Sequence, residues 1–233
     1  MLKGIGLQLD LEELEREARA KLGDSIYRRA AGGSQDEITL ARNCEAWRAI
    51  ALAPRVLRGI TAPSTNTTVL GTAVSTPVLI APAGLAAYTA HPEQEMAVAR
   101  GTAAAGSLMA LCNFAALSLE QVAAAAPACP RWFQLYMQLD RGWTQELLER
   151  AHTSGYGAIV LTADAGDGMP GALSALKTPP PMVRTEFEPS LSLSDIEWVK
   201  SRAGLPVIVK GVLRPDDASE CVAAGADAIV VSN

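Results

Sequence analysis

The chain of 233 residues is 49% hydrophobic and 19% charged, which is typical of globular proteins and excludes a disordered or collagen-like chain. Its formal net charge is −5 and it has no long basic run, so the charge argues against a nucleic-acid-binding groove. No stretch approaches the ~18 consecutive apolar residues of a membrane span. The first ten residues also reach an acidic side chain too soon for a signal peptide.

The four cysteines are scattered along the chain and form no C-x-x-C pair. This pattern predicts neither a zinc site nor a disulfide framework, and it suits a reducing compartment. We therefore expect a cytoplasmic protein without a bound metal ion. We expect neither nucleic acid nor a membrane among its partners.

The first third of the chain is predicted to be mainly helical. From Asp10 to Gly23, apolar side chains recur at helical spacing, which predicts an amphipathic helix that Asp10 caps and Gly23 ends. A second helical pattern covers residues 36–48, and residues 67–71 are typical of a short strand and turn. We assign residues 1–76 to an N-terminal helical lead-in with a small hairpin.

From residue 77 onward, short apolar runs alternate with longer helical patterns. Six runs are expected to be buried strands, at residues 78–81, 108–112, 132–136, 158–162, 207–210 and 228–231. The helical patterns between them cover residues 92–105, 118–126, 142–154, 192–203 and 215–224. Such alternation predicts parallel βαβ units. The longest interval, residues 165–189, is rich in Gly and Pro and is the predicted active-site loop.

Parallel βαβ units build either an open doubly wound sheet or a closed (β/α)8 barrel. No G-x-G-x-x-G motif follows the first strand, which disfavours a dinucleotide-binding open sheet. Polar side chains instead recur at the C-terminal ends of successive strands, as at the rim of a barrel active site. We therefore assign residues 77–233 to an incomplete (β/α)8 TIM barrel of about six units. Because six strands leave two open edges, we expect pairing with a second copy, as a homo-oligomer, or with a complementing chain.

Several polar side chains lie at the ends of the predicted strands. Lys210 ends a run of buried β-branched residues, so a desolvated cation facing an anion is favoured over a lysine that reaches solvent. Gln134 and Tyr136 share one strand face and need hydrogen-bond partners, either in a polar ligand or in a structural network. Thr162 and Asp164 also share a face, where Asp164 can orient a base or cap a turn.

Two further features bear on the chemistry of the rim. The small residues at 81–84 allow backbone groups to approach a flat ligand closely. His91 and His152 are the only histidines, and both fit helix positions that cap, pack or face solvent. No histidine ends a predicted strand, so the sequence offers no evident general base.

Six ordered motifs are similar to those of a known family. They cover residues 77–83, 90–95, 132–136, 161–164, 206–211 and 225–233, and the lead-in is similar at residues 31–43 and 54–57. Through them the chain resembles the FMN-dependent α-hydroxy-acid oxidase and dehydrogenase family, which includes enzymes that oxidise glycolate, lactate and mandelate. Type 2 isopentenyl-diphosphate isomerase and inosine-monophosphate dehydrogenase share the lysine and the A-G-A-D strand. They lack the combination of motifs at 132–136 and 161–164.

The resemblance implies a (β/α)8 barrel with FMN at the C-terminal rim. There a 2-hydroxy acid passes its α-hydrogen to the flavin as a hydride while a histidine takes the hydroxyl proton, although a carbanion route has also been argued. Lys210 would then stabilise the anionic reduced flavin, Tyr136 would contact the substrate, and Asp164 would hold the histidine as imidazolium. The other residues implied to contact FMN are Pro82, Ala83, Gly84, Gln134, Thr162 and Ser232.

The chain departs from the family pattern at several positions. The family continues after the last motif with His-Gly-Gly-Arg-Gln, so the sequence given lacks the catalytic histidine, a carboxylate-binding arginine and strands seven and eight. Arg29 stands where the family has a substrate-contacting tyrosine, and Cys112 stands where a serine usually contacts FMN. Residues 165–171 replace an arginine-bearing motif. We therefore expect a C-terminally truncated copy.

We predict an FMN-dependent oxidoreductase that converts a small 2-hydroxy acid to the 2-oxo acid and is impaired by the missing C-terminal third. The alternative is a non-catalytic truncated remnant or interaction module of that family. A different phosphate-ligand barrel enzyme is a third interpretation. The sequence leaves open which hydroxy acid is the substrate and whether oxygen or a carrier protein accepts the electrons.

Overall fold

The computed structural model describes residues 10–84, 91–165 and 180–232. The chain divides into two compact units, with the boundary between Pro63 and Ser64. Among the described helices, none is long and apolar enough to cross a membrane.

The first unit is helical, as the lead-in pattern predicts. Its helices are α1 (Leu11–Leu22), α2 (Asp24–Ala31) and α3 (Ile38–Ala49). The Asp10 carboxylate accepts backbone N–H groups of the first turn of α1 at 3.0 and 3.1 Å, and Gly23 follows the helix at φ 74°. The predicted cap and stop of this helix are therefore confirmed.

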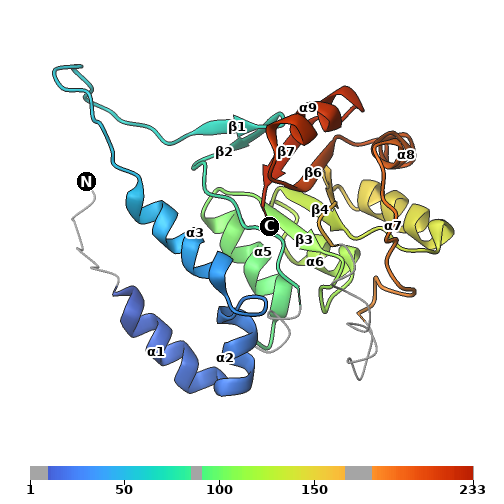
Figure 1. Ribbon diagram of the computed structural model, residues 1–233, viewed down its shortest axis with the longest axis horizontal. Helices are drawn as coiled ribbons and strands as arrows, with labels where there is room; N and C mark the ends of the chain where they lie inside the picture. The colour runs from blue at the N-terminus through green and yellow to red at the C-terminus, as the bar shows by residue number, and fades with distance from the viewer. Residues whose placement is uncertain (1–9, 85–90, 166–179, 233) are drawn as a thin grey trace. The chain divides into compact units, whose positions relative to one another are not determined.

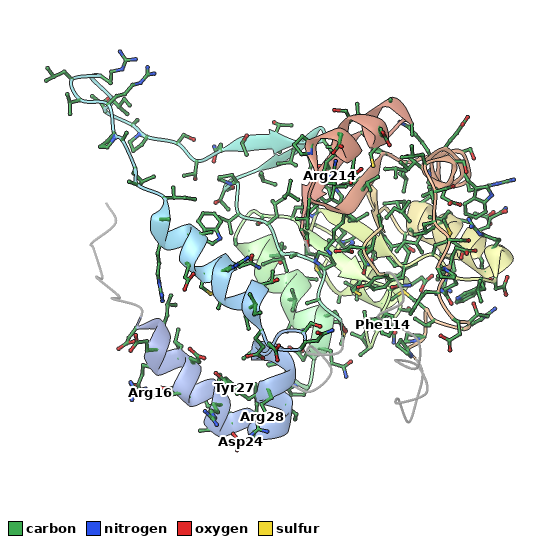
Figure 2. The ribbon with its side chains drawn as sticks, in the orientation of Figure 1. Arg16, Asp24, Tyr27, Arg28, Phe114 and Arg214 are labelled. Atoms are coloured by element: carbon green, nitrogen blue, oxygen red, sulfur yellow. The ribbon has the colours of Figure 1, made fainter. Side chains whose placement is uncertain are left out.

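Helix α2 is not among the predicted helices, because Gly23 ends one helix and immediately precedes the next. This short helix is held to α1 by side chains of both. The Arg19 guanidinium pairs with Asp24 at 3.0 Å, and the Tyr27 hydroxyl donates to Glu15. Figure 2 labels Asp24 and Tyr27 on this helix.

The second unit begins with a hairpin of β1 (Thr67–Val69) and β2 (Thr72–Val74), which pair antiparallel. The two residues of its turn, Leu70 and Gly71, both have positive φ, as the type I′ turns of two-residue hairpins require. Val74 is buried in one cluster with side chains of the parallel sheet. The hairpin thus packs with the residues that follow it, whereas the sequence pattern groups it with the lead-in.

The main sheet is parallel throughout and has the order β3-β4-β5-β6-β7. Its strands are β3 (Met109–Cys112), β4 (Arg131–Leu135), β5 (Ile159–Thr162), β6 (Val207–Val212) and β7 (Ala228–Val231). Helices of the second unit are α5 (Gln94–Ala104), α6 (Leu119–Ala125), α7 (Arg141–Thr153), α8 (Ser194–Ala203) and α9 (Pro215–Ala223). Strands next to each other in the chain are neighbours in the sheet, and helices connect them (Figure 1). This is the arrangement of an incomplete (β/α)8 barrel.

The strand predicted at residues 78–81 is much shorter than expected. Only Ile80 forms a bridge, with Met109, in the parallel direction. Pro77 and Pro82 flank this run and donate no N–H to a ladder, which limits pairing to the residues between them.

The sheet buries a different core on each face. The outer core packs strand side chains such as Leu111, Phe133 and Leu161 against the surrounding helices. The inner core contains Leu108, Ala110, Trp132, Ala158, Val160 and Ile208. Because successive side chains of a strand point to opposite faces, this division determines which polar residues project inward at the strand ends.

Candidate functional site

Four predicted site residues continue the inner face of the sheet at its carboxyl edge. Each follows an inner-core residue of its own strand by two positions, so the strand alternation places it on the same face. The pairs of inner-core and site residue are Ala110 and Cys112, Trp132 and Gln134, Val160 and Thr162, and Ile208 and Lys210. Strand register therefore brings together four of the residues singled out from the sequence.

Gln134 and Thr162 form the buried centre of this group. Gln134 Nε2 donates to Thr162 Oγ1 at 2.8 Å, and each residue is only 1% exposed. Gln134 Oε1 is buried and accepts no hydrogen bond from the part of the chain that the structure describes. A buried acceptor without a partner is destabilising in most proteins, so this oxygen is available to a donor supplied from outside those residues.

Lys210 lies opposite Thr162 in the sheet and beside Asp164. The Lys210 and Thr162 Cα atoms are register partners, and Lys210 Nζ lies 3.9 Å from Asp164 Oδ2. The two charged side chains are 19% and 24% exposed. A cation is thus held at the rim of the inner face, with one carboxylate nearby.

Cys112 lies against the loop that follows β3. The Phe114 backbone N–H donates to Cys112 Sγ at 3.3 Å. Burial raises the pKa of the Cys112 thiol to about 12, so this side chain is neutral near pH 7.

The predicted turn at residues 81–84 reaches the same loop. A Cβ atom on Gly84 would lie 2.8 Å from Phe114 Cβ and 3.5 Å from Cys112 Sγ, so the chain passes close here only because residue 84 lacks a side chain. Pro82 is half-buried and Ala83 is exposed.

Tyr136 belongs to an aromatic cluster rather than to the polar group. Its ring centroid lies 5.7 Å from that of Phe114 and 5.3 Å from that of Phe187. Burial raises the pKa of Tyr136 to about 12, with smaller effects from Cys112 and Asp164, so the phenol stays protonated. Phe114 (labelled in Figure 2) and Phe187 were not predicted to belong to the site. The position of Phe114, two residues after β3, was a usable signal.

Gln138 was also missed, although it continues the alternation of Gln134 and Tyr136. Its side chain is fully buried. Gln138 Nε2 donates to the Met182 carbonyl at 3.0 Å. Its Oε1 accepts the N–H groups of Arg184 and Thr185 at 2.8 and 3.2 Å. These bonds attach the segment that carries Phe187 to the end of β4.

The remaining predicted residues lie in other elements of the described chain. Ser232 follows β7 two positions after Val230, a residue packed on the inner core. Arg29 belongs to α2 of the first unit. Residues 166–171 of the replaced arginine-bearing motif lie outside the described residues.

Neither histidine is engaged with the site residues in the described chain. His91 is exposed, and its Nδ1 accepts the Glu93 N–H at 3.1 Å. His152 lies in α7 with its Nδ1 2.7 Å from the Ala203 carbonyl oxygen. Both contacts agree with the structural roles expected from the sequence.

A family model, curated relatives and solved structures all relate this chain to FMN-dependent enzymes or 2-hydroxy-acid oxidases. Residues 18–168 and 169–233 match the FMN-dependent dehydrogenase family. The chain is 35% identical over 251 residues to glycolate oxidase 3 of Oryza sativa subsp. indica, with 96% of this chain and 68% of that protein covered. It is 34% identical over 253 residues to 2-hydroxyacid oxidase 1 of Mus musculus, with the same two shares covered.

A solved structure also matches this chain over most of its length. It is a mutant of mandelate oxidase with a monooxide FMN adduct, and it matches with a TM-score of 0.83 and 35% identity. The match covers 95% of this chain and 67% of the mandelate oxidase chain, so this chain spans about two thirds of the length of its relatives. On this evidence the chain is a member of the FMN-dependent dehydrogenase family, whose relatives include 2-hydroxy-acid oxidases.

Proposed function

We propose that this chain binds FMN at the carboxyl edge of the inner face and takes part in oxidising a small 2-hydroxy acid to the 2-oxo acid. The observation that carries the proposal is the buried Gln134 Oε1, which has no hydrogen-bond partner in the described chain. It lies in one group with Thr162 and, across the β5–β6 pairing, Lys210.

The residues present fit a flavin ring. Gln134 Oε1 can accept the ring N–H that an isoalloxazine offers, and Thr162 Oγ1 orients the Gln134 amide for this contact. Lys210 supplies a positive charge at the rim. Gly84 lets the backbone of the 81–84 turn come close to a flat ligand, because no side chain intervenes.

Lys210 has the clearest electrostatic role in this proposal. FMN, when bound, supplies the acceptor for the substrate hydride. A partly buried ammonium group beside the ring would stabilise negative charge more strongly than the same group in water. Pro82, Ala83, Cys112 and Ser232 are proposed as further flavin contacts through small side chains or backbone groups.

One residue is proposed for the substrate side. Tyr136 would donate its hydroxyl to the hydroxy acid, since its raised pKa keeps the phenol protonated. Asp164 has the family role of holding a catalytic histidine, but in the described chain its ion pair is with Lys210.

A second candidate function is a non-catalytic member of the family that serves as a remnant or interaction module. The favouring observation is that no hydrogen bond or ion pair joins Asp164 to a histidine in the described chain. An enzyme that works without its general base typically shows turnover lowered by ~10²–10⁴-fold. For either function we propose a cytoplasmic location, and a second copy or a complementing chain as the partner.

Anaerobic flavin spectroscopy of the purified chain distinguishes these candidates. Titration with FMN should quench flavin fluorescence, and lactate, glycolate or mandelate should then bleach the absorbance of the bound flavin. Bleaching with turnover ~10²–10⁴-fold below that of full-length relatives supports the impaired oxidoreductase. Failure to bind FMN rejects the proposal and leaves the non-catalytic alternative. Bound flavin that no hydroxy acid bleaches would favour the non-catalytic member of the family.

A further inference from the structure

The strand that carries Lys210 is irregular at the next residue. Lys210 pairs with Val230 across β6 and β7, and Val212 pairs with Val231, so Gly211 forms a β-bulge without a counterpart of its own. Gly211 has φ 107°, a backbone conformation that residues with a Cβ atom rarely adopt. Bulges of this kind redirect neighbouring side chains and are frequent next to active sites.

Gly211 also leaves space that another residue fills. A Cβ atom on Gly211 would lie 2.5 Å from Asp164 Cγ, 2.6 Å from Asp164 Cβ and 2.7 Å from Asp164 Oδ1. These separations are shorter than any non-bonded carbon contact, so the Asp164 carboxyl group occupies the volume where a side chain at position 211 would be. Gly225 differs in this respect, since it has φ 100° but nothing within 4 Å of its ideal Cβ position.

This close approach determines where the Asp164 charge lies. The Ala163 N–H donates to the Lys210 carbonyl at 2.8 Å, which ties the chain before Asp164 to the strand before the bulge. From there the carboxylate reaches over Gly211 and places Oδ2 3.9 Å from Lys210 Nζ. A side chain at position 211 would force the carboxylate away from this place.

We propose that Gly211 is a positioning residue of the candidate site, whose bulged backbone and missing side chain hold the Asp164 carboxylate beside Lys210. The electrostatic part of this inference rests on the proposed function, in which Lys210 faces the flavin. There the Asp164 carboxylate offsets part of the lysine charge. A displaced carboxylate leaves that charge less compensated, which stabilises the reduced flavin and raises its midpoint potential.

The steric part can be tested without flavin by thermal unfolding of four variants. Gly211→Ala and Gly225→Ala introduce the same methyl group at a similar positive φ, but only the first meets Asp164. Gly211→Ala should lower Tm by roughly 5 °C more than Gly225→Ala does. In the Asp164→Gly background, which removes all three clashing atoms, Gly211→Ala should lower Tm no more than Gly225→Ala does in the wild type.

The unfolding comparison can either support or overturn the steric part of the inference. Equal Tm losses for Gly211→Ala and Gly225→Ala would overturn the inference, as would an excess loss that persists in the Asp164→Gly background. If Gly211→Ala fails to fold, recovery of folding by Asp164→Gly supports the inference and continued failure contradicts it.

The electrostatic part is tested by the midpoint potential of bound FMN, which a purely structural role would not shift in a fixed direction. Gly211→Ala and Asp164→Gly should both raise the potential, and Gly225→Ala should leave it unchanged. A potential that Gly211→Ala leaves unchanged or lowers overturns this part. If the wild-type chain binds no FMN, the proposed function fails, whereas the unfolding comparison still decides whether Gly211 acts through Asp164.

Discussion

Gln134 and Thr162 are joined by a side-chain hydrogen bond of 2.8 Å although they lie 28 positions apart in the chain. The bond is diagonal, since the register partner of Gln134 on β5 is Val160, two residues before Thr162. This stagger directs the Gln134 Nε2 toward Thr162 and leaves its Oε1 without a partner in the described residues. The pair therefore presents one oriented acceptor at the edge of the inner face.

Replacing Thr162 with valine should weaken FMN binding. The substitution removes the acceptor for Gln134 Nε2, which leaves a buried donor unpaired and lowers the free energy of unfolding by about 1–3 kcal/mol. The reoriented amide should raise the FMN dissociation constant by about tenfold, measured by fluorescence quenching. Thr144→Val is the matched control, because Thr144 is equally buried and its hydroxyl accepts the Gln138 backbone N–H at 3.3 Å and donates to the Asp140 carbonyl at 3.1 Å, without a contact to Gln134. If both variants affect FMN binding alike, Thr162 has no special part in it.

Replacing Lys210 with methionine should make bound FMN harder to reduce. The variant keeps the apolar stem but removes the rim cation, so the reduced flavin loses a stabilising charge and its midpoint potential falls. The FMN dissociation constant should rise by about 10- to 100-fold, as expected for a lost charged contact. Lys200→Met is the control. Lys200 also pairs with a carboxylate, Asp227, at 2.8 Å, but Asp227 precedes β7 and therefore lies at the amino end of that strand, whereas the candidate site is at the carboxyl edge of the sheet. An unchanged potential in Lys210→Met would refute the electrostatic role.

Replacing Gln138 with leucine should destabilise the aromatic cluster. The variant leaves the N–H groups of Arg184 and Thr185 and the Met182 carbonyl without their buried partner. We expect a loss of about 2–3 kcal/mol in the free energy of unfolding by urea, together with a weaker near-ultraviolet circular dichroism signal from the aromatic cluster that contains Phe187. Gln145→Leu serves as the control because its amide donates to the exposed Glu149 at 2.9 Å. A near-ultraviolet signal identical to that of the wild type would contradict the positioning role.

The pair of Glu120 and Arg150 should make stability depend on acid pH. Arg150 donates to Glu120 at 2.7 and 3.1 Å and lowers the pKa of that carboxyl group to about 2. Since the unfolded pKa of Glu is about 4.3, the stabilisation is complete above that pH and is lost as the pH falls toward 2. Because Glu120 is half exposed, the contribution should stay below about 1 kcal/mol.

Urea unfolding of Glu120→Gln and the wild type across pH 2–6 checks this expectation. The difference in free energy of unfolding should be largest near pH 6 and should shrink steadily as the pH falls from about 4.3 to 2. In an Arg150→Gln background the same comparison should show no such trend. A difference that grows as the pH falls would have the wrong sign for a lowered pKa.

Much of the fold could be predicted because it depends on local patterns. The strand at 228–231 was predicted with its observed bounds, and the others were predicted to within two residues apart from the run at 78–81. Gln134 was predictable as an inward-facing residue, because successive side chains of a strand point to opposite faces of the sheet. Helix α2 was missed, since a glycine that stops one helix gives no local sign that another begins directly after it.

The amino-acid sequence by itself determined the βα repeat, the inward direction of Gln134, Thr162 and Lys210, and the similarity to a flavin-dependent family. These features depend on residue periodicity and on motifs within short segments. Only the tertiary structure decided that Gln134 bonds to Thr162, that Asp164 lies over Gly211 beside Lys210, and that Phe187 packs on Tyr136. Such contacts depend on strand register, on a bulge and on the hydrogen bonds that Gln138 makes to residues 182–185. Residues that are distant in the chain determine these features together.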